Sequence, residues 1–211
     1  MYNPVRICFE KRGNLKFISH LDLNRTMQRA IIRSKIPVWY TEGFNPHPFM
    51  TFLLPLSLGI ESDCEYFDIK CDDNMTHDEI KSCLNNVLPI GLHITDVFFP
   101  IMKAKEITFA GYEIVLIDTD LQRINEFFSQ DRMAVIKRTK SGEKEIDIKP
   151  YISNLEITEN ENKIKISLVL PAGNVENINP HLILNAMGDL PFSLVGILRN
   201  SVFNKNMENF K

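Results

Sequence analysis

Residues 64–71 read Cys-Glu-Tyr-Phe-Asp-Ile-Lys-Cys, with apolar and polar side chains in alternation. This pattern is typical of a strand that buries one face and leaves the other in water. Upstream, residues 5–11 alternate in the same way, and further short strands are predicted at residues 38–40 and 50–56. Downstream, residues 92–99 supply another strand. Together these segments predict a sheet in the first half of the chain.

Two helices are predicted between these strands. Ser19 can cap a helix that begins near His20, where Asp22 complements the positive helix end. Thr76 can cap the second helix, with Glu79 at the capping-box position. The residues expected on the buried faces are Leu23, Met27, Ala30, Ile31 and Ser34 in the first helix, and Ile80, Cys83, Leu84 and Val87 in the second.

The order of these elements, β-α-β-β-α-β, is that of a ferredoxin-like domain with two helices on one face of an antiparallel sheet. Residues 103–211 are expected to repeat this order with one inserted hairpin at 133–148. We therefore predict an α+β protein of two tandem ferredoxin-like (βαββαβ) halves, residues 1–102 and 103–211. The polar tail, residues 204–211, is expected to fray.

Composition indicates a cytoplasmic protein. The chain has 211 residues, 44% of them hydrophobic, which is enough to form one large or two small cores. Its cysteines are separated, without a CxxC pair, so they are expected to be buried thiols rather than ligands of zinc or of an iron–sulfur cluster. Neither a secretory signal nor an apolar run of about 18 residues is expected, so no membrane association is predicted.

Charge is distributed unevenly along the chain. Residues 1–50 hold eight Lys/Arg and three Asp/Glu (+5), residues 51–131 hold five and fifteen (−10), and residues 132–211 hold eleven and nine (+2), which sum to the net charge of −3. An acidic middle between basic ends can steer a polyanion to one face. An ordinary mixed surface would also account for these numbers.

The first helix and the loop after it carry the most distinctive polar residues. Arg25, Arg29 and Arg33 recur every four residues, and on the helix only Asp22 lies within reach of one of them. In the loop, two prolines flank His47, which predicts a stiff, non-helical segment that holds a ligand.

Three segments resemble the signature blocks of a bacterial family of unknown function described as radical-SAM-linked proteins. They are Phe-Ile-Ser-His-Leu-Asp-Leu at 17–23, Gly-Phe-Asn-Pro-His-Pro at 43–48, and Leu-Pro-Leu-Ser-Leu-Gly-Ile-Glu-Ser at 54–62. Residues 137–147 resemble the family's C-terminal block. One departure from the family pattern is Phe49-Met50, because a basic residue is expected after the second proline of the 43–48 segment. The resemblance implies a radical-SAM protein encoded nearby as the partner. The iron–sulfur cluster and S-adenosylmethionine are expected on that partner, since this chain has no CxxxCxxC motif and no cofactor of its own is predicted.

Binding of nucleic acid is the leading interpretation. Basic side chains can contact phosphates, and Trp39, Tyr40 and Phe44 can stack, although Trp39 is expected to lie in the core. The predicted nucleic-acid-binding residues are Arg12, Lys16, Arg25, Arg29, Arg33, Asn45, His47, Lys137, Arg138 and Lys140. We expect an accessory RNA-binding or substrate-presenting protein that acts with a radical-SAM enzyme in RNA modification or processing. Its RNA would be tRNA or ribosomal RNA, and no catalytic activity of its own is expected.

Two alternatives stay open. His20 and His47 could act as acid and base in a metal-independent endoribonuclease. His20, Asp22 and His47 form only a weak ligand set, so no metal site is predicted. The arginines of the first helix could instead dock an acidic protein in a scaffold, a hypothesis that the apolar Ile32 on the charged side of that helix favours.

Overall fold

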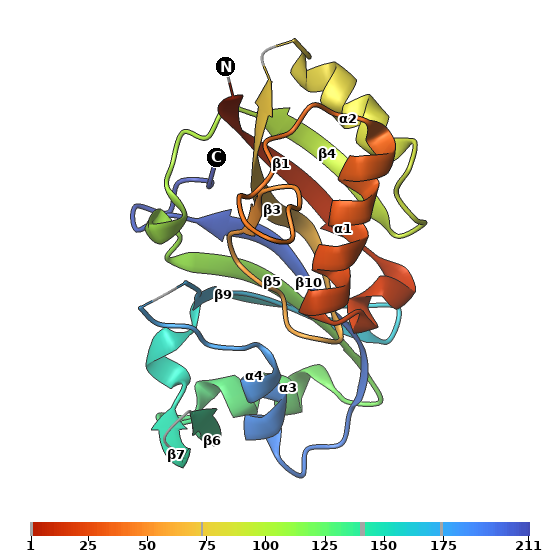
Figure 1. Cartoon of the computed structure of the whole chain (residues 1–211). Coiled ribbons are helices and arrows are strands. Elements are labelled where there is room, and N and C mark those ends of the chain that lie inside the picture. Colours follow the sequence, from red (N-terminus) through yellow and green to blue (C-terminus); the bar gives the residue numbers. More distant parts are fainter. Residues whose placement is uncertain (1, 73, 140–141, 174) are drawn as a thin grey trace. The chain divides into compact units, whose positions relative to one another are not determined.

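The computed structural model describes residues 2–72, 74–139, 142–173 and 175–211. The chain divides into two compact units, Met1–Glu106 with Lys211 and Ile107–Phe210, whereas the boundary predicted from the sequence followed residue 102. Over the described residues the protein is a mixed α+β structure with antiparallel strand pairing and four α-helices (Figure 1).

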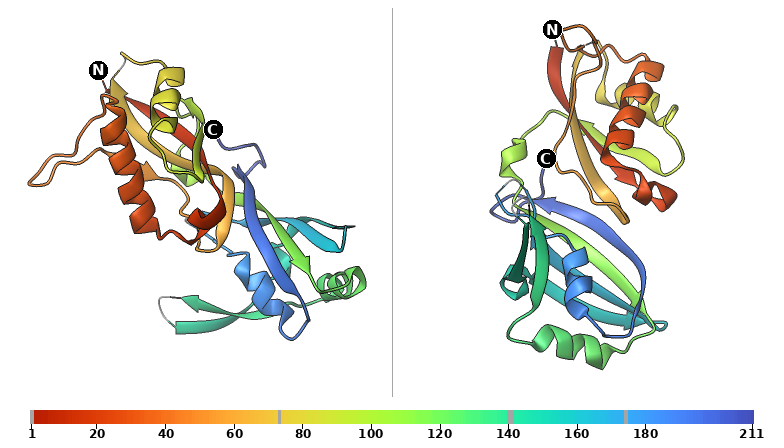
Figure 2. Two further views of the ribbon diagram at one scale, coloured as in Figure 1. Left: turned by 90° about the vertical axis from the view of Figure 1, so that its right-hand side faces the viewer. Right: turned by 60° about the horizontal axis from the view of Figure 1, so that its bottom comes forward.

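The first unit contains a four-stranded antiparallel sheet in the order β4-β1-β3-β2. Two helices, α1 and α2, cover one face of this sheet (Figures 1 and 2). The bounds of the elements are β1 (Tyr2–Lys11), the 3-10 turn η1 (Gly13–Phe17), α1 (His20–Ser34), β2 (Met50–Phe52), β3 (Ile60–Asp72), α2 (His77–Asn85), β4 (Leu92–Phe98) and η2 (Ala104–Glu106).

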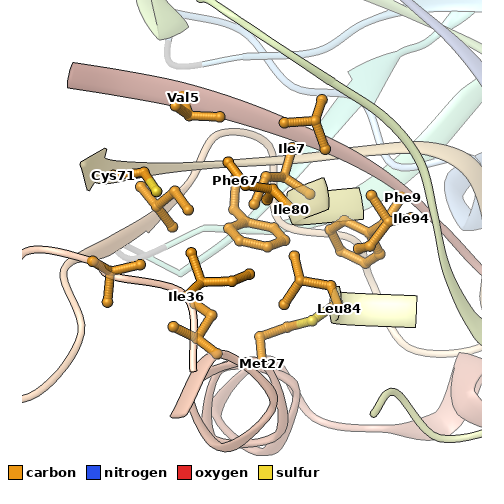
Figure 3. Close-up of a cluster of buried hydrophobic side chains, with 14 of the residues drawn as sticks. Val5, Ile7, Phe9, Met27, Ile36, Phe67, Cys71, Ile80, Leu84 and Ile94 are labelled. Atoms are coloured by element: carbon orange, nitrogen blue, oxygen red, sulfur yellow. The ribbon is translucent and has the colours of Figure 1, made fainter. Parts of the chain in front are cut away.

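The core of this unit fills the space between the sheet and the two helices (Figure 3). Ile7 and Phe9 of β1 and Phe67 and Ile69 of β3 are fully buried, and Met27 of α1 packs against them. Burial of each such side chain contributes roughly 1.5–3 kcal/mol. The alternation that predicted the strands therefore also fixes which sheet face the helices cover.

Local capping signals set the helix starts as predicted. The Ser19 hydroxyl accepts a hydrogen bond from the Asp22 N–H (3.1 Å), and α1 ends where Lys35 adopts a left-handed conformation. Thr76 and Glu79 form the reciprocal capping box. Of the side chains predicted to be buried, Leu23, Met27, Ala30, Ile31, Ile80 and Leu84 are buried, whereas Ser34, Cys83 and Val87 are half-buried.

The strands around β2 are shorter than predicted. Only Met50–Phe52 of residues 50–56 is a strand, and residues 38–40 make two isolated bridges, Val38 with Cys71 and Tyr40 with Pro48. Pro55 has no N–H to donate to a ladder, so the pairing with β3 cannot extend through it.

The sheet face opposite the helices is polar. Arg6 is 1% exposed and makes two hydrogen bonds to the Asp68 carboxylate, from Nε to Oδ1 (2.8 Å) and from Nη2 to Oδ2 (2.9 Å). Its Nη1 donates to the Met102 carbonyl (2.8 Å). Beside it, burial raises the pKa of the Cys8 thiol, while hydrogen bonds with Thr95 and Tyr66 oppose that rise. Ion-paired and hydrogen-bonded side chains therefore occupy this part of the face in place of apolar packing.

The second unit has an antiparallel sheet in the order β10-β5-β9-β8, with a separate β6-β7 hairpin. The hairpin was predicted, and its expected turn residue Ser141 lies outside the described residues. The bounds are β5 (Phe109–Ile117), α3 (Leu121–Ser129), β6 (Ala134–Thr139), β7 (Gly142–Asp147), η3 (Lys149–Tyr151), β8 (Ser153–Asn160), β9 (Lys163–Pro171), α4 (His181–Met187) and β10 (Ser193–Phe203).

The expectation that the C-terminal tail frays was wrong. Phe210 is 1% exposed, and its N–H donates to the Val202 carbonyl (2.9 Å). Asn204 is 7% exposed, and its side chain accepts from the Glu208 N–H (3.1 Å). The buried Phe210 ring holds this otherwise polar segment in place. The prediction of a frayed tail used the average polarity of residues 204–211 and so gave no weight to this single ring.

Cys8, Cys64 and Cys71 are buried free thiols and Cys83 is half-buried. No helix within the described ranges combines the length and the apolar character needed to cross a bilayer.

Candidate nucleic-acid interface

The segment between α1 and β2 forms a projecting loop with a hydrogen-bonded base. The Phe49 N–H donates to the Trp39 carbonyl (2.9 Å), and the Thr41 N–H donates to the His47 carbonyl (2.9 Å). Figure 2 (left) shows this loop extending away from the helices and the sheet of its unit. The Phe44 side chain at its tip is 112% exposed. We call residues 39–49 the 39–49 loop.

His47 is held within this loop by its neighbours. Its backbone N–H donates to the Thr41 hydroxyl (3.2 Å), and its Nδ1 lies 3.1 Å from both the Thr41 hydroxyl and the Asn45 carbonyl. A carbonyl oxygen can only accept, so the bond to Asn45 requires the proton on Nδ1. The Nε2 atom of a neutral His47 is then an acceptor for a ligand group.

An aromatic pair with a cation lies at the base of the loop. The Trp39 and Phe49 rings are 5.4 Å apart in an edge-to-face arrangement, and Lys70 Nζ lies 4.7 Å from the first ring centre and 5.2 Å from the second. Their sequence neighbours Val38 and Met50 pack in the core, so these side chains lie on the sheet face opposite the helices. Trp39 is half-buried and outside the core cluster, so the expectation of a core tryptophan was wrong.

The same alternation extends along the loop. Thr41 and His47 are two residues beyond Trp39 and Phe49 on their respective strands, so they lie on the same face as the aromatic pair. We call Trp39, Thr41, His47, Phe49 and Lys70 the loop face. Because α1 packs on the other side of the sheet, the arginines of α1 and His47 belong to different surfaces.

The arginines of α1 differ in their partners. Arg25 pairs with Asp22 (3.2 Å), and the hydrogen bond from Ser19, followed by that from Arg25, lowers the pKa of the Asp22 carboxyl. The Arg33 Nη2 donates to the Val87 carbonyl (2.9 Å) and so joins α1 to the end of α2. Arg29 is exposed and makes no hydrogen bond or ion pair with another described residue.

Arg12 is largely neutralised. Three carboxylates surround its guanidinium, those of Glu10 (3.9 Å), Glu61 (3.6 Å) and Asp63, the last in direct hydrogen-bond contact. Two of these acids are about fifty residues away in sequence, so the pattern around Arg12 gave no sign of them. Arg12 therefore adds little positive potential to a phosphate-binding surface.

The remaining predicted basic residues are spread over both units. Lys16 Nζ lies 5.4 Å from the ring centre of Phe17 at the end of η1. Lys137, in the second unit, donates from Nζ to the Asn177 carbonyl (2.8 Å). The side chain of Arg138 and all of Lys140 lie outside the described residues.

The two candidate catalytic histidines have separate surroundings. The His20 ring contacts the Phe52 ring edge-to-face at 5.1 Å, whereas His47 is bonded to Thr41 and Asn45. No hydrogen bond joins the two imidazoles in the described structure. In the described ranges, no group of three His, Cys, Asp or Glu side chains is arranged to hold a metal ion.

Sequence reasoning missed Phe49 and Lys70. Phe49 stands where a basic residue was expected, and the structure brings the Lys70 ammonium from β3 to the ring of Phe49. The alternation in residues 64–71 predicts that Lys70 lies on the polar face of its strand. That pattern was the feature of the sequence that could have identified Lys70.

The chain was compared with known proteins. A family model described as "Uncharacterized protein conserved in bacteria (DUF2344)" matches residues 5–180. No curated protein matches the chain. A chain in the solved structure titled "Crystal Structure of a Cbf5-Nop10-Gar1 Complex" is similar, with a TM-score of 0.52 and 8% identity over 94% of this chain and 48% of that one. This chain thus spans about half the length of that solved relative, and at this identity the likeness concerns the fold alone.

Proposed function

We propose that this chain, which belongs to the bacterial family DUF2344, is an accessory RNA-binding protein that presents RNA to a radical-SAM enzyme in the cytoplasm. The observation that carries the proposal is the Trp39–Phe49 ring pair with Lys70 beside it, next to His47 on a projecting loop. Aromatic faces stack on bases, and each stacked base contributes roughly 1–3 kcal/mol. The Lys70 ammonium lies where it can contact the phosphate that follows a stacked base.

The fold supports the same proposal. The strand order is β4-β1-β3-β2 in the first unit and, with the β6-β7 hairpin set aside, β10-β5-β9-β8 in the second. Counted along the chain, both orders are fourth, first, third and second strand. This is the order of a ferredoxin-like domain, and we propose that the two units are tandem domains of that kind. Four-stranded nucleic-acid modules use the sheet face that is free of helices. In the first unit that face is buried at Arg6 and Cys8, so the comparison rests on the part of it that carries Lys70.

The ligand that fits the loop face is single-stranded RNA. A ring can stack only on a base that has left its duplex, and Phe44 at the loop tip is fully exposed for such a contact. Asn45 and His47 follow it, with an amide and an imidazole that can bond to base edges. Loops and ends of tRNA or ribosomal RNA offer such unstacked bases.

The partner in this proposal comes from the resemblance to radical-SAM-linked proteins. The partner would hold the iron–sulfur cluster and S-adenosylmethionine, and this chain would bind and orient the RNA. The separate surroundings of His20 and His47 support a role without catalysis by this chain, because an acid–base pair must reach the same reacting group.

Binding of a labelled single-stranded RNA of about 12 nucleotides, measured by fluorescence anisotropy, tests the proposal. Phe44→Ala and Lys70→Met should each weaken binding by about fivefold or more, which corresponds to the loss of about 1 kcal/mol of stacking or cation contact. Phe17→Ala is the matched control, since Phe17 is also exposed (65%) and also lies near a lysine, but belongs to another surface.

A duplex of the same sequence should bind more weakly than the single strand. Equal losses for Phe44→Ala and Phe17→Ala, or equal binding of duplex and single strand, would contradict recognition by the loop face. Cleavage of the RNA by the wild-type protein that disappears in His47→Ala would instead support the nuclease alternative.

A further inference from the structure

The outer side of α1 carries an ordered stripe of four exposed residues. Leu21, Arg25, Arg29 and Ile32 follow one another at helical spacing, on the side opposite the buried face of the helix. Leu21 is 58% exposed and Ile32 is 54% exposed. We call these four residues the α1 stripe. Two aliphatic side chains thus stand at the ends of the stripe, with two guanidinium groups between them.

The dimensions of the α1 stripe match one side of a second helix. Leu21 and Ile32 are eleven residues apart, which at about 1.5 Å per residue separates them by roughly 16 Å. A packed helix contacts its neighbour through apolar residues at such intervals, with charged residues alongside them. The two aliphatic ends therefore provide two contact points, and the guanidinium groups fix the charge of the region between them.

Charge and apolar exposure together favour a protein over a nucleic acid at this surface. A phosphate backbone would engage Arg25 and Arg29 but would leave Leu21 and Ile32 in water. An amphipathic helix would cover all four. Arginine also forms paired hydrogen bonds with carboxylates, so acidic residues complement the middle of the stripe.

We propose that the α1 stripe docks an acidic amphipathic helix of a partner protein. Aliphatic residues of that helix would pack on Leu21 and Ile32, and its carboxylates would pair with Arg25 and Arg29. The stripe and the loop face lie on opposite sides of the sheet in the first unit, so both can be occupied at the same time. This inference stands independently of the RNA-binding proposal.

A designed helical peptide of about 18 residues provides the probe. It carries two leucines eleven positions apart, two glutamates between them at a spacing of four, and alanine and glutamine elsewhere. Binding to the full chain, followed by fluorescence anisotropy, should saturate. The charge-reversal variant Arg25→Glu with Arg29→Glu should lose at least about tenfold in affinity. A second peptide with lysines in place of the glutamates should bind this variant better than it binds the wild type.

Arg123→Glu is the matched charge control. Arg123 is an exposed arginine of α3 that pairs with Asp120 three residues earlier (3.0 Å), as Arg25 pairs with Asp22. For the aliphatic contacts, Leu21→Gln and Ile32→Gln should each weaken peptide binding. Ile90→Gln should not, because Ile90 is also exposed (101%) but lies in the turn after α2.

Three results would overturn the docking proposal. They are the absence of saturable binding of the acidic peptide, equal losses for the Arg25→Glu, Arg29→Glu variant and for Arg123→Glu, and no recovery of binding with the lysine peptide. Loss of RNA binding in the Arg25→Glu, Arg29→Glu variant together with unchanged peptide binding would assign the stripe to RNA instead. Failure of Phe44→Ala to affect RNA binding would leave the peptide results untouched, so the two proposals can fail separately.

Discussion

Replacing Asp68 with leucine should strongly destabilise the first unit. Arg6 is 1% exposed and Asp68 is 23% exposed, so the substitution leaves a buried guanidinium without its two hydrogen bonds to the carboxylate. Removing one partner of a buried ion pair typically costs 3–5 kcal/mol. Because water reaches part of Asp68, we expect the lower end, about 3 kcal/mol.

Urea unfolding followed by tryptophan fluorescence measures this effect on the first unit alone. Trp39 is the sole tryptophan of the chain, and it lies in this unit beside Phe49. With a urea dependence of about 2 kcal/mol per molar, a loss of about 3 kcal/mol lowers the midpoint by about 1.5 M. Restricting the probe to one unit avoids averaging two separate transitions.

The double variant Arg6→Met, Asp68→Leu completes the thermodynamic cycle. Removing both charges also removes the cost of the unpaired guanidinium, so the double variant should recover at least half of the lost stability. A loss below about 1 kcal/mol for Asp68→Leu would refute the reasoning. A double variant as unstable as Asp68→Leu alone would also refute it, because the cost would then come from lost packing.

Three further outcomes are expected. Phe210→Ala should cost about 3 kcal/mol in thermal or urea unfolding, as for other buried phenylalanines, whereas a fraying tail would show no change. Gly91→Ala should destabilise the first unit by more than about 1 kcal/mol, because its φ is +94° and the added Cβ would lie 2.7 Å from the Arg12 carbonyl; unchanged stability would contradict this contact. A backbone hydrogen bond from Thr76 holds the pKa of Glu79 below its ordinary value of 4.5, so its contribution is present above that value and lost as pH falls through the lowered folded pKa. Glu79→Gln removes the titrating carboxyl and should therefore reduce the acid sensitivity of urea unfolding between about pH 5 and pH 3, and an unchanged pH profile would argue against the capping box.

Local patterns predicted the helices well because their determinants are local. Ser19 and Thr76 cap the helices that their neighbours predicted, and the apolar spacing identified Met27 and Ile80 as core residues. The strand at 50–56 was over-extended, because whether a segment pairs depends on the partner that β3 offers as well as on its own residues. The ordered tail depends on a site for Phe210 that only the folded unit provides.

The candidate site was predicted in part. The loop around His47 was identified from its prolines, and the structure adds that Thr41 and Asn45 fix the ring. The neutralisation of Arg12 and the position of Lys70 could not be read from sequence spacing, because both depend on strand register across many residues. The separation of His47 from the α1 arginines likewise depends on which sheet face each element covers.

The closed base of the 39–49 loop has a thermodynamic consequence for any ligand that it takes. The two backbone hydrogen bonds between its strands and the two prolines restrict the loop before a ligand arrives. Association then loses little additional conformational entropy, so a modest contact area can give useful affinity. A variant that relaxes the loop outside the loop face, such as Pro46→Gly, should make binding entropically more costly in calorimetry while leaving every side chain of the loop face in place.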